Sequence, residues 1–147
     1  MQTKFKYFTL KELCDTNTAE ELGIDNFPTF EIVDHLSTLV DNILDPLRKD
    51  WGSAIYISSG YRSEALNNAV NGSKTSVHRL GWAADMQPVN GNFEGFKCFV
   101  QIWLTKNKVP FDQLIIEKNS KGNKWLHIGL YSTSGLQRGQ VKSMNVV

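Results

Sequence analysis

Apolar side chains recur at intervals of three and four residues in two parts of the chain, the spacing of a buried stripe along an α-helix. The longer pattern predicts a helix over about residues 29–50, directly after the helix-breaking residues 26–28. The second pattern predicts a helix over about residues 93–106. The apolar positions are Ile32, Leu36, Leu39, Val40, Ile43, Leu44 and Leu47 in the first stripe, and Phe96, Phe99, Val100, Trp103 and Leu104 in the second. We expect both stripes to lie in the core.

Short apolar and alternating runs elsewhere predict β-strands. The runs are residues 54–57, 112–118 and 124–130, together with a further run that ends at Asp85. The first run leads through a turn into a helix predicted over about residues 63–70, and the turn-rich residues 119–123 join the last two runs into a hairpin. Helices come first and strands gather later, so the predicted fold class is α+β. We expect a single domain over residues 1–147, with a mostly antiparallel sheet flanked by helices.

Length and charge narrow the range of functions. A chain of 147 residues fits one ordinary domain, and its net charge of +1 disfavours a nucleic-acid-binding protein, which typically has a strongly basic domain. The charge is uneven, because residues 1–96 hold 8 basic and 13 acidic side chains and residues 97–147 hold 8 basic and 2 acidic ones. A basic surface on the last third suits an anionic polymer, although a merely solvated face would have the same composition.

The sequence carries no signal for a membrane or for export. No stretch approaches the roughly 18 apolar residues of a membrane span, and the first residues are charged where a signal peptide needs an apolar segment. The two cysteines, Cys14 and Cys98, form neither a disulfide framework nor a C-x-x-C pair, so we expect both to be thiols in the core. The expected setting is the cytoplasm, until something else releases the protein.

Two histidines and an aspartate form a candidate metal site: His78, Asp85 and His127. Catalytic zinc sites usually have three protein ligands of this kind and leave the fourth position to water, whose pKa the metal lowers to about 7. Judged by residue type alone, the alternative is that these three residues are ordinary buried or surface residues and form no metal site. The third histidine, His35, lies on the polar side of the first predicted helix and has no partner at ligand spacing.

Strand parity places a carboxylate beside this site. Side chains alternate between the two faces of a strand, so His127 points away from the apolar face, and pairing Lys118 with Lys124 puts Glu117 on the same face as His127. A carboxylate next to a metal-bound water can act as general base. Arg62, after a strand and a Gly turn, could stabilise an oxyanion or clamp a substrate carboxylate. A solvated hairpin-end glutamate and a structural salt-bridge arginine are the alternative interpretations.

Several motifs together resemble peptidase family M15, in particular its small phage-type members. They are Ser59-Gly60-Tyr61-Arg62-Ser63, Ser76-x-His78-x-x-Gly81-x-Ala83-x-Asp85, Asp112-Gln113-Leu114-Ile115 and Trp125-x-His127. The resemblance extends over about residues 8–130 and implies the hedgehog/DD-peptidase fold. Relatives of this type include D-alanyl-D-alanine carboxypeptidases and the L-alanyl-D-glutamate endopeptidases that act as phage endolysins.

The resemblance also implies roles for individual residues. His78, Asp85 and His127 would hold one Zn²⁺ ion, Glu117 would be the general base, Arg62 would contact the substrate or oxyanion, and Ser76 would help to bind substrate. The chain departs from the family pattern where some relatives place an acid three residues before the last histidine, because Lys124 stands there. Many relatives also have histidine where this chain has Trp125. Glu117 remains the expected base, since Asp112 lies farther from the hairpin end and on the opposite parity.

The expected function is therefore zinc-dependent hydrolysis of peptide bonds in the stem peptides of bacterial peptidoglycan, by a D,D-carboxypeptidase or an L-alanyl-D-glutamate endopeptidase. We expect a monomeric phage or prophage endolysin, released at lysis or carried in the virion, with no nucleic-acid or membrane partner. Loops such as residues 86–92 and 131–140 are expected to select the bond. The alternatives are a non-catalytic, zinc-stabilised module that binds cell walls or proteins, and a cytoplasmic dipeptidase.

Overall fold

The predicted helix over residues 29–50 is present and has one irregularity near its middle. The computed structural model, which describes residues 5–14 and 17–146, divides it into α3 (Phe30–Leu39), the π-helical turn η1 (Val40–Leu44) and α4 (Asp45–Trp51). Thr29 caps its start by accepting a hydrogen bond from the backbone N–H of Ile32. Gly52 ends it in the left-handed conformation that favours glycine, with a φ of 77°. No pattern in the sequence marks the π turn, whose apolar residues continue the buried stripe.

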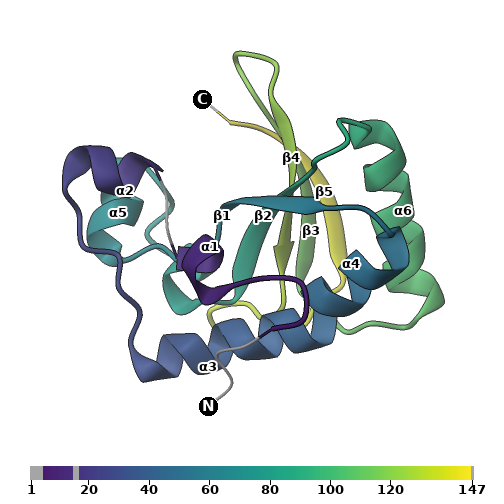
Figure 1. Cartoon of the computed structure of the whole chain (residues 1–147), viewed down its shortest axis with the longest axis horizontal. Coiled ribbons are helices and arrows are strands. Elements are labelled where there is room, and N and C mark those ends of the chain that lie inside the picture. The colour runs from purple at the N-terminus through teal and green to yellow at the C-terminus, as the bar shows by residue number, and fades with distance from the viewer. Residues whose placement is uncertain (1–4, 15–16, 147) are drawn as a thin grey trace.

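Five strands form one sheet in the order β1-β2-β4-β3-β5 (Figure 1). Their bounds are β1 (Ile55–Ser59), β2 (Ala83–Pro88), β3 (Gln113–Asn119), β4 (Lys124–Gly129) and β5 (Gln140–Val146). The first three pairings are antiparallel, and β5 lies parallel to β3. The predicted α+β class, with a mostly antiparallel sheet, is confirmed. The strand expected to end at Asp85 instead continues to Pro88, so Asp85 lies in its middle.

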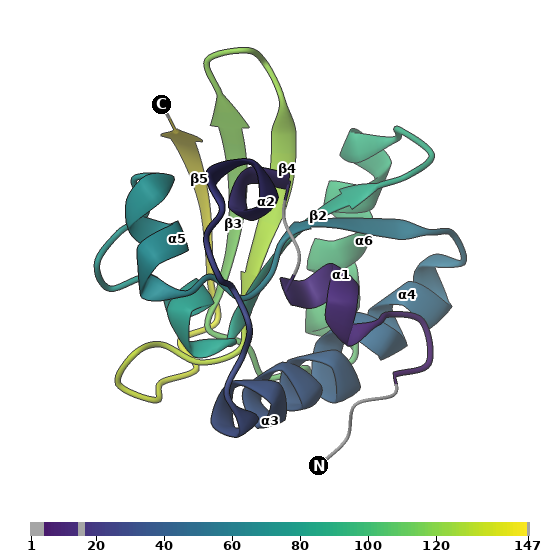
Figure 2. The same cartoon turned by 60° about the vertical axis from the view of Figure 1, so that its left-hand side comes forward.

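The remaining helices flank the sheet. They are α1 (Leu10–Cys14), α2 (Asn17–Leu22), α5 (Glu64–Ala69), the 3₁₀ turn η2 (Val77–Leu80) and α6 (Phe93–Lys106). The predicted helix over residues 93–106 is confirmed, and the one predicted over 63–70 is present as α5. α5 and α6 lie on opposite sides of the sheet (Figure 2). The sheet therefore separates a helical layer containing α6 from the side that α5 and η2 border.

The core occupies one face of the sheet. Met86 of β2 pairs with Leu126 of β4, both side chains are fully buried, and they belong to the same hydrophobic cluster as Phe96 of α6. Because side chains alternate along a strand, the intervening positions point to the opposite face. Asp85 and His127 occupy such positions and are direct partners across β2 and β4. The core thus fixes the strands whose other face carries the candidate metal ligands.

The last part of the chain adds the edge strand β5 to the sheet. Gln140 begins β5, and its backbone N–H donates to the carbonyl of Asp112, 2.9 Å away. The Asp112 carboxylate holds Arg138, with Nε to Oδ1 at 2.7 Å and Nη2 to Oδ2 at 2.8 Å. This contact fastens the segment before β5 to the start of β3.

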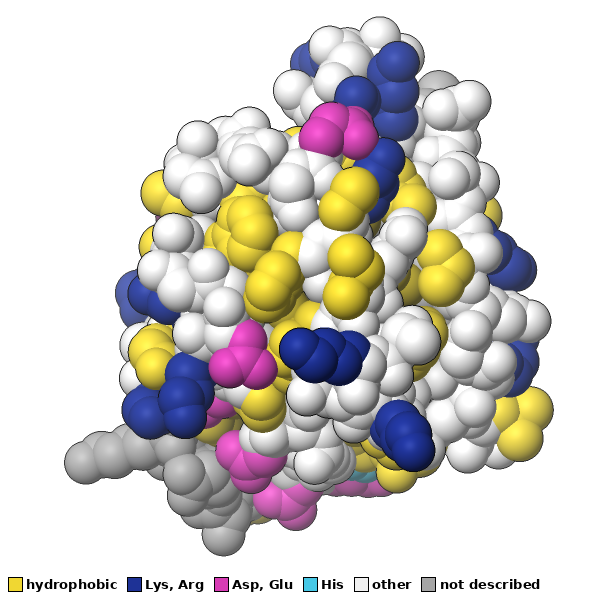
Figure 3. Space-filling model, turned by 90° about the vertical axis from the view of Figure 1, so that its right-hand side faces the viewer, with side chains coloured by type: hydrophobic (Ala, Val, Ile, Leu, Met, Phe, Trp, Pro, Cys, Tyr) yellow, Lys and Arg dark blue, Asp and Glu magenta, His cyan; other side chains and the backbone are white. Residues whose placement is uncertain are grey.

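Basic side chains lie on the projecting β3–β4 hairpin, at the top of Figure 3. Lys118, Lys121 and Lys124 are exposed there, and Lys124 also lies 3.7 Å from Glu94. The expected core position of Cys98 is wrong, because its side chain is exposed on the outer surface of α6. None of the helices in the described part of the chain has the length and apolar character needed to cross a bilayer.

Candidate metal centre

His78, Asp85 and His127 come together from three elements, η2, β2 and β4. His78 Nε2 lies 3.3 Å from Asp85 Oδ1 and 3.2 Å from His127 Nδ1, and the latter two atoms are 3.1 Å apart. The three atoms form a nearly equilateral triangle. Both histidines are buried, and Asp85 is partly buried.

The triangle has the dimensions of a metal site. Around a tetrahedral zinc ion with bonds of about 2.0 to 2.1 Å, neighbouring ligand atoms lie about 3.3 Å apart. The separations observed here are 3.1 to 3.3 Å. Two imidazoles and one carboxylate also match the donor set of catalytic zinc sites, which leave one position for water or substrate. Within the described residues, this group is the His, Cys, Asp and Glu cluster able to hold a metal ion.

Local backbone structure orients the His78 side chain toward the other two ligands. Ser76 caps η2 by accepting a hydrogen bond from the His78 backbone N–H, and Gly81 ends the turn with a φ of 75°. The Nδ1–H of His78 donates to the carbonyl of Gly60, 2.7 Å away, which leaves Nε2 free to bind a metal. A side chain at Gly60 would overlap the backbone of Leu13. Gly60 therefore lets α1 pack against the segment that orients the first ligand.

The charges at the centre favour metal binding. Burial lowers the pKa of His78, which keeps the imidazole neutral and available as a ligand. Burial acts to raise the pKa of Asp85, but the adjacent His78 and His127 outweigh it and hold this pKa below its usual value. A neutral imidazole and an ionised carboxylate are the forms in which these side chains bind metals.

Glu117 lies beside the centre, on the same face of the sheet as His127. The predicted pairing of Lys118 with Lys124 is present, so Glu117 is the direct partner of Trp125. The indole Nε1–H of Trp125 donates to Glu117 Oε1 at 3.1 Å. Burial raises the pKa of Glu117, and the negative charge of Asp85 raises it further. A higher pKa makes a carboxylate a stronger base, which suits a group that takes a proton from water.

Arg62 and Ser76 form one wall of the pocket over the centre. Arg62 Nη2 lies 3.4 Å from Ser76 Oγ, and its backbone N–H donates to the carbonyl of His78. Burial lowers the pKa of the Arg62 guanidinium. Within residues 5–14 and 17–146, the buried Nε of Arg62 has no hydrogen-bond partner. Arg62 lines the pocket, and a guanidinium has five N–H donors that can bind a carboxylate or an oxyanion.

All six predicted site residues line one pocket of about 980 Å³. They are Arg62, Ser76, His78, Asp85, Glu117 and His127. Residues 70–73, Thr75, residues 132–134 and Met144 of β5 also line it. Sequence reasoning missed residues 70–75 and β5, and it missed Arg138, which no local motif marks. Of the two loops expected to select the bond, 131–140 contributes to the lining, but 86–92 does not.

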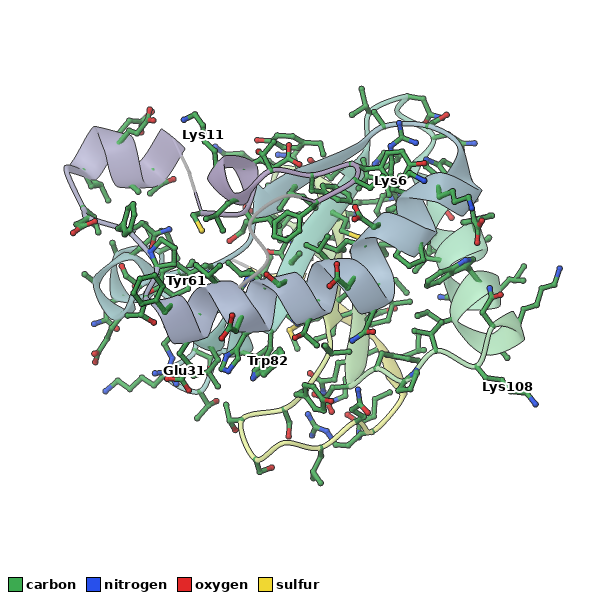
Figure 4. The ribbon with its side chains drawn as sticks, turned by 60° about the horizontal axis from the view of Figure 1, so that its bottom comes forward. Lys6, Lys11, Glu31, Tyr61, Trp82 and Lys108 are labelled. Atoms are coloured by element: carbon green, nitrogen blue, oxygen red, sulfur yellow. The ribbon has the colours of Figure 1, made fainter. Side chains whose placement is uncertain are left out.

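His35 lies outside the centre. Its ring stacks on Trp82 with a centroid distance of 3.9 Å, and its Nδ1–H donates to the carbonyl of Leu80 at 2.6 Å. Figure 4 shows Trp82 next to α3, near Glu31, which is 3.9 Å from His35 Nε2. His35 is therefore a packing residue, less exposed than its place on the polar side of the helix predicts.

The sequence matches a protein-family model described as Peptidase M15 over residues 6–129. The chain belongs to peptidase family M15. The resemblance inferred from its motifs is thereby confirmed. M15 peptidases are zinc-dependent metallopeptidases, and the His78, Asp85 and His127 group can hold the metal. A search of curated proteins finds no match to the sequence.

Replacing one ligand of the M15 centre tests it directly. His127→Ala removes one of three ligand atoms, so we expect zinc to be lost on dialysis because two ligands hold the ion too weakly. Elemental analysis by mass spectrometry gives the zinc content per protein molecule. His35→Ala is the matched control and is expected to keep about one zinc ion. Equal zinc contents in the two variants would contradict the assignment.

A second prediction concerns the support of His78. In Gly60→Ala the new methyl group meets the Leu13 carbonyl, so the strand end must shift together with the carbonyl that holds the His78 ring. We expect zinc affinity to fall about 10-fold or more, since loss of such supporting contacts typically costs about 10- to 100-fold. Competition with a chromophoric chelator measures this affinity. An unchanged dissociation constant would show that the Gly60 contact does not position the ligand.

Proposed function

We propose that this M15 protein is a zinc-dependent peptidase that hydrolyses peptide bonds in the stem peptides of bacterial peptidoglycan. The observation that carries the proposal is the arrangement in one pocket of three convergent metal ligands and a glutamate, Glu117, that is not one of them. Metal-assisted peptide hydrolysis requires both parts, a Lewis-acid centre and a nearby general base.

The metal ligands and Glu117 have different roles in the proposed reaction. His78, Asp85 and His127 would hold the zinc ion, which would supply a Lewis acid able to lower the pKa of a water molecule and to polarise a carbonyl. Glu117 accepts the proton from the attacking water and delivers it to the leaving amine, so it acts first as base and then as acid. Trp125 keeps the Glu117 carboxylate in place through the hydrogen bond to Oε1. The raised pKa of Glu117 suits both proton transfers.

Arg62 and Ser76 bind the substrate at the wall of the pocket. The guanidinium of Arg62, which lines the pocket, can donate to the oxygen that becomes negatively charged as the bond breaks, or to a substrate carboxylate. Ser76 orients the guanidinium through its Oγ, 3.4 Å from Nη2. Burial strengthens such a contact, because the local dielectric constant is low.

The proposal includes a biological setting. The protein acts as a monomeric phage or prophage endolysin that stays in the cytoplasm until lysis, or it is carried in the virion. The cleaved bond is either D-alanyl-D-alanine or L-alanyl-D-glutamate. The basic hairpin with Lys118, Lys121 and Lys124 supports an anionic, wall-like substrate. A wall-binding module without activity is the alternative that the following experiment separates.

The first test is mass spectrometry of purified peptidoglycan after incubation with the zinc-loaded protein, with a chelated sample and His127→Ala in parallel. We expect new fragments that disappear in both controls, since both remove the metal. Loss of one alanine identifies a carboxypeptidase, whereas freed peptides that begin with glutamate identify an L-alanyl-D-glutamate endopeptidase. Walls that bind the protein but stay chemically unchanged would support the binding module instead.

Glu117→Gln tests the proposed base. The amide keeps the shape of the side chain but cannot accept the proton, so we expect kcat to fall by about 10²- to 10⁴-fold while zinc is retained. The measurements are release of the peptide product and zinc content. Glu94→Gln, on the exposed start of α6, is the matched control and should keep full activity. Full activity in Glu117→Gln would exclude this residue as the base.

A further inference from the structure

An ion pair with one buried and one exposed partner lies in the same pocket as the metal centre but is not part of it. Asp112 is almost fully buried, at 2% exposed, and the Arg138 side chain is 40% exposed. The guanidinium binds the carboxylate side-on through Nε and Nη2, and the Arg138 backbone N–H donates to the same carboxylate at 3.2 Å. Asp112 therefore fixes both the backbone and the side chain of Arg138.

This geometry uses only part of the hydrogen-bonding capacity of Arg138. A guanidinium has five N–H donors, and the Asp112 contact uses one from Nε and one from Nη2. The edge formed by Nη1 and the second Nη2 hydrogen can bind another carboxylate in the same forked manner. Arg138 lines the pocket together with Thr133 and Ser134, whose hydroxyls are further potential donors. The arginine is thus pre-oriented and half-exposed.

The register of the sheet places this pair relative to the metal centre. On β3, Ile115 is the partner of the ligand His127, and Glu117 lies two residues further along. Asp112 lies three residues from Ile115 in the opposite direction, about 10 Å along a strand. An extended peptide advances about 3.3 to 3.6 Å per residue. A substrate group bound by Arg138 would therefore lie two to three residues from the scissile bond at the metal centre.

The charge of the lining also favours an anion. Its charged side chains in the described part of the chain are two guanidiniums and three carboxylates: Arg62, Arg138, Asp85, Asp112 and Glu117. With a divalent ion at the centre, these groups leave the pocket with a net charge of +1. The Asp112 carboxylate neutralises the charge of Arg138 but leaves the Nη1–Nη2 edge of the guanidinium uncovered. A carboxylate at that edge gains charge-assisted hydrogen bonds that an amide cannot match.

We infer that Arg138 is a specificity-determining residue that binds a free carboxylate of the substrate at the end of the pocket opposite Glu117. The nature of the ligand as an acidic peptide rests on the proposed function. In a stem peptide cut between its last two alanines, the α-carboxylate of the glutamate lies at the required separation. Amidation of that carboxylate removes the negative charge and weakens the contact.

The test uses synthetic stem pentapeptides, L-Ala-D-Glu-L-Lys-D-Ala-D-Ala, in which each carboxyl group is amidated one at a time. For the wild-type holoenzyme, we expect one amidation to lower kcat/KM by about 10- to 100-fold, mainly through KM. Arg138→Gln is expected to abolish that acid-to-amide ratio. Lys142→Gln is the matched control, because it removes one positive charge from exposed β5 outside the pocket lining and should keep the ratio.

The ratio is measured within each variant, so it does not depend on how much active protein each preparation contains. Arg138→Lys keeps the charge but loses the fork and is expected to retain only part of the ratio. A wild-type ratio near one for every carboxyl group overturns the inference, and so does a ratio that survives Arg138→Gln. An equal loss of the acid-to-amide ratio in the Arg138→Gln and Lys142→Gln variants overturns the inference as well, since an equal loss would indicate general electrostatic attraction.

A binding measurement separates this inference from the proposed function. Calorimetry with the same peptides and Glu117→Gln protein reports affinity without cleavage. If wild-type protein cleaves none of the peptides but the free acid binds more tightly than the amide in an Arg138-dependent way, the peptidase proposal fails and the carboxylate site stands. If the peptides are cleaved and both forms bind equally well, the peptidase proposal stands and the carboxylate site is excluded.

Discussion

The pairing of Asp85 with His127 across β2 and β4 is the constraint on which the site depends. Because side chains alternate between the faces of a strand, a shift of one residue in this register would turn one ligand into the core. The neighbouring pair Met86 and Leu126 is fully buried on the other face, so burial of apolar surface holds the register. The hydrophobic core thereby determines whether two of the three ligands meet.

The third ligand depends on the packing of α1 against the segment that follows β1. His78 is oriented by the carbonyl of Gly60, and Gly60 fits against the backbone of Leu13 in α1 because it has no side chain. The backbone N–H of Tyr61 also donates to the Leu13 carbonyl, at 2.8 Å. A contact from the first described helix thus reaches the metal centre through one glycine.

The pocket has different chemistry at its two ends, and β3 connects them. Toward the hairpin, Glu117 lies in a partly buried position where its pKa is raised and Trp125 holds its carboxylate. Toward the start of β3, hydrogen bonds from Arg138 outweigh the effect of burial and lower the pKa of Asp112, which therefore stays ionised. Two carboxylates five residues apart on one chain segment thus have opposite pKa shifts. The first environment suits proton transfer, whereas the second suits a fixed ion pair.

The sequence determined the elements whose side chains follow a local period. It predicted the helix over residues 93–106, the hairpin register and the common face of Glu117 and His127, because alternation and turn length depend on neighbouring residues only. The triangle of metal ligands was inferred from residue types and family motifs, but only tertiary structure brings His78 to the two strands. The Asp112–Arg138 pair spans 26 positions and depends on the parallel docking of β5 against β3, which no local pattern specifies. Contacts of this kind arise when distant segments pack, and only the tertiary structure decided them.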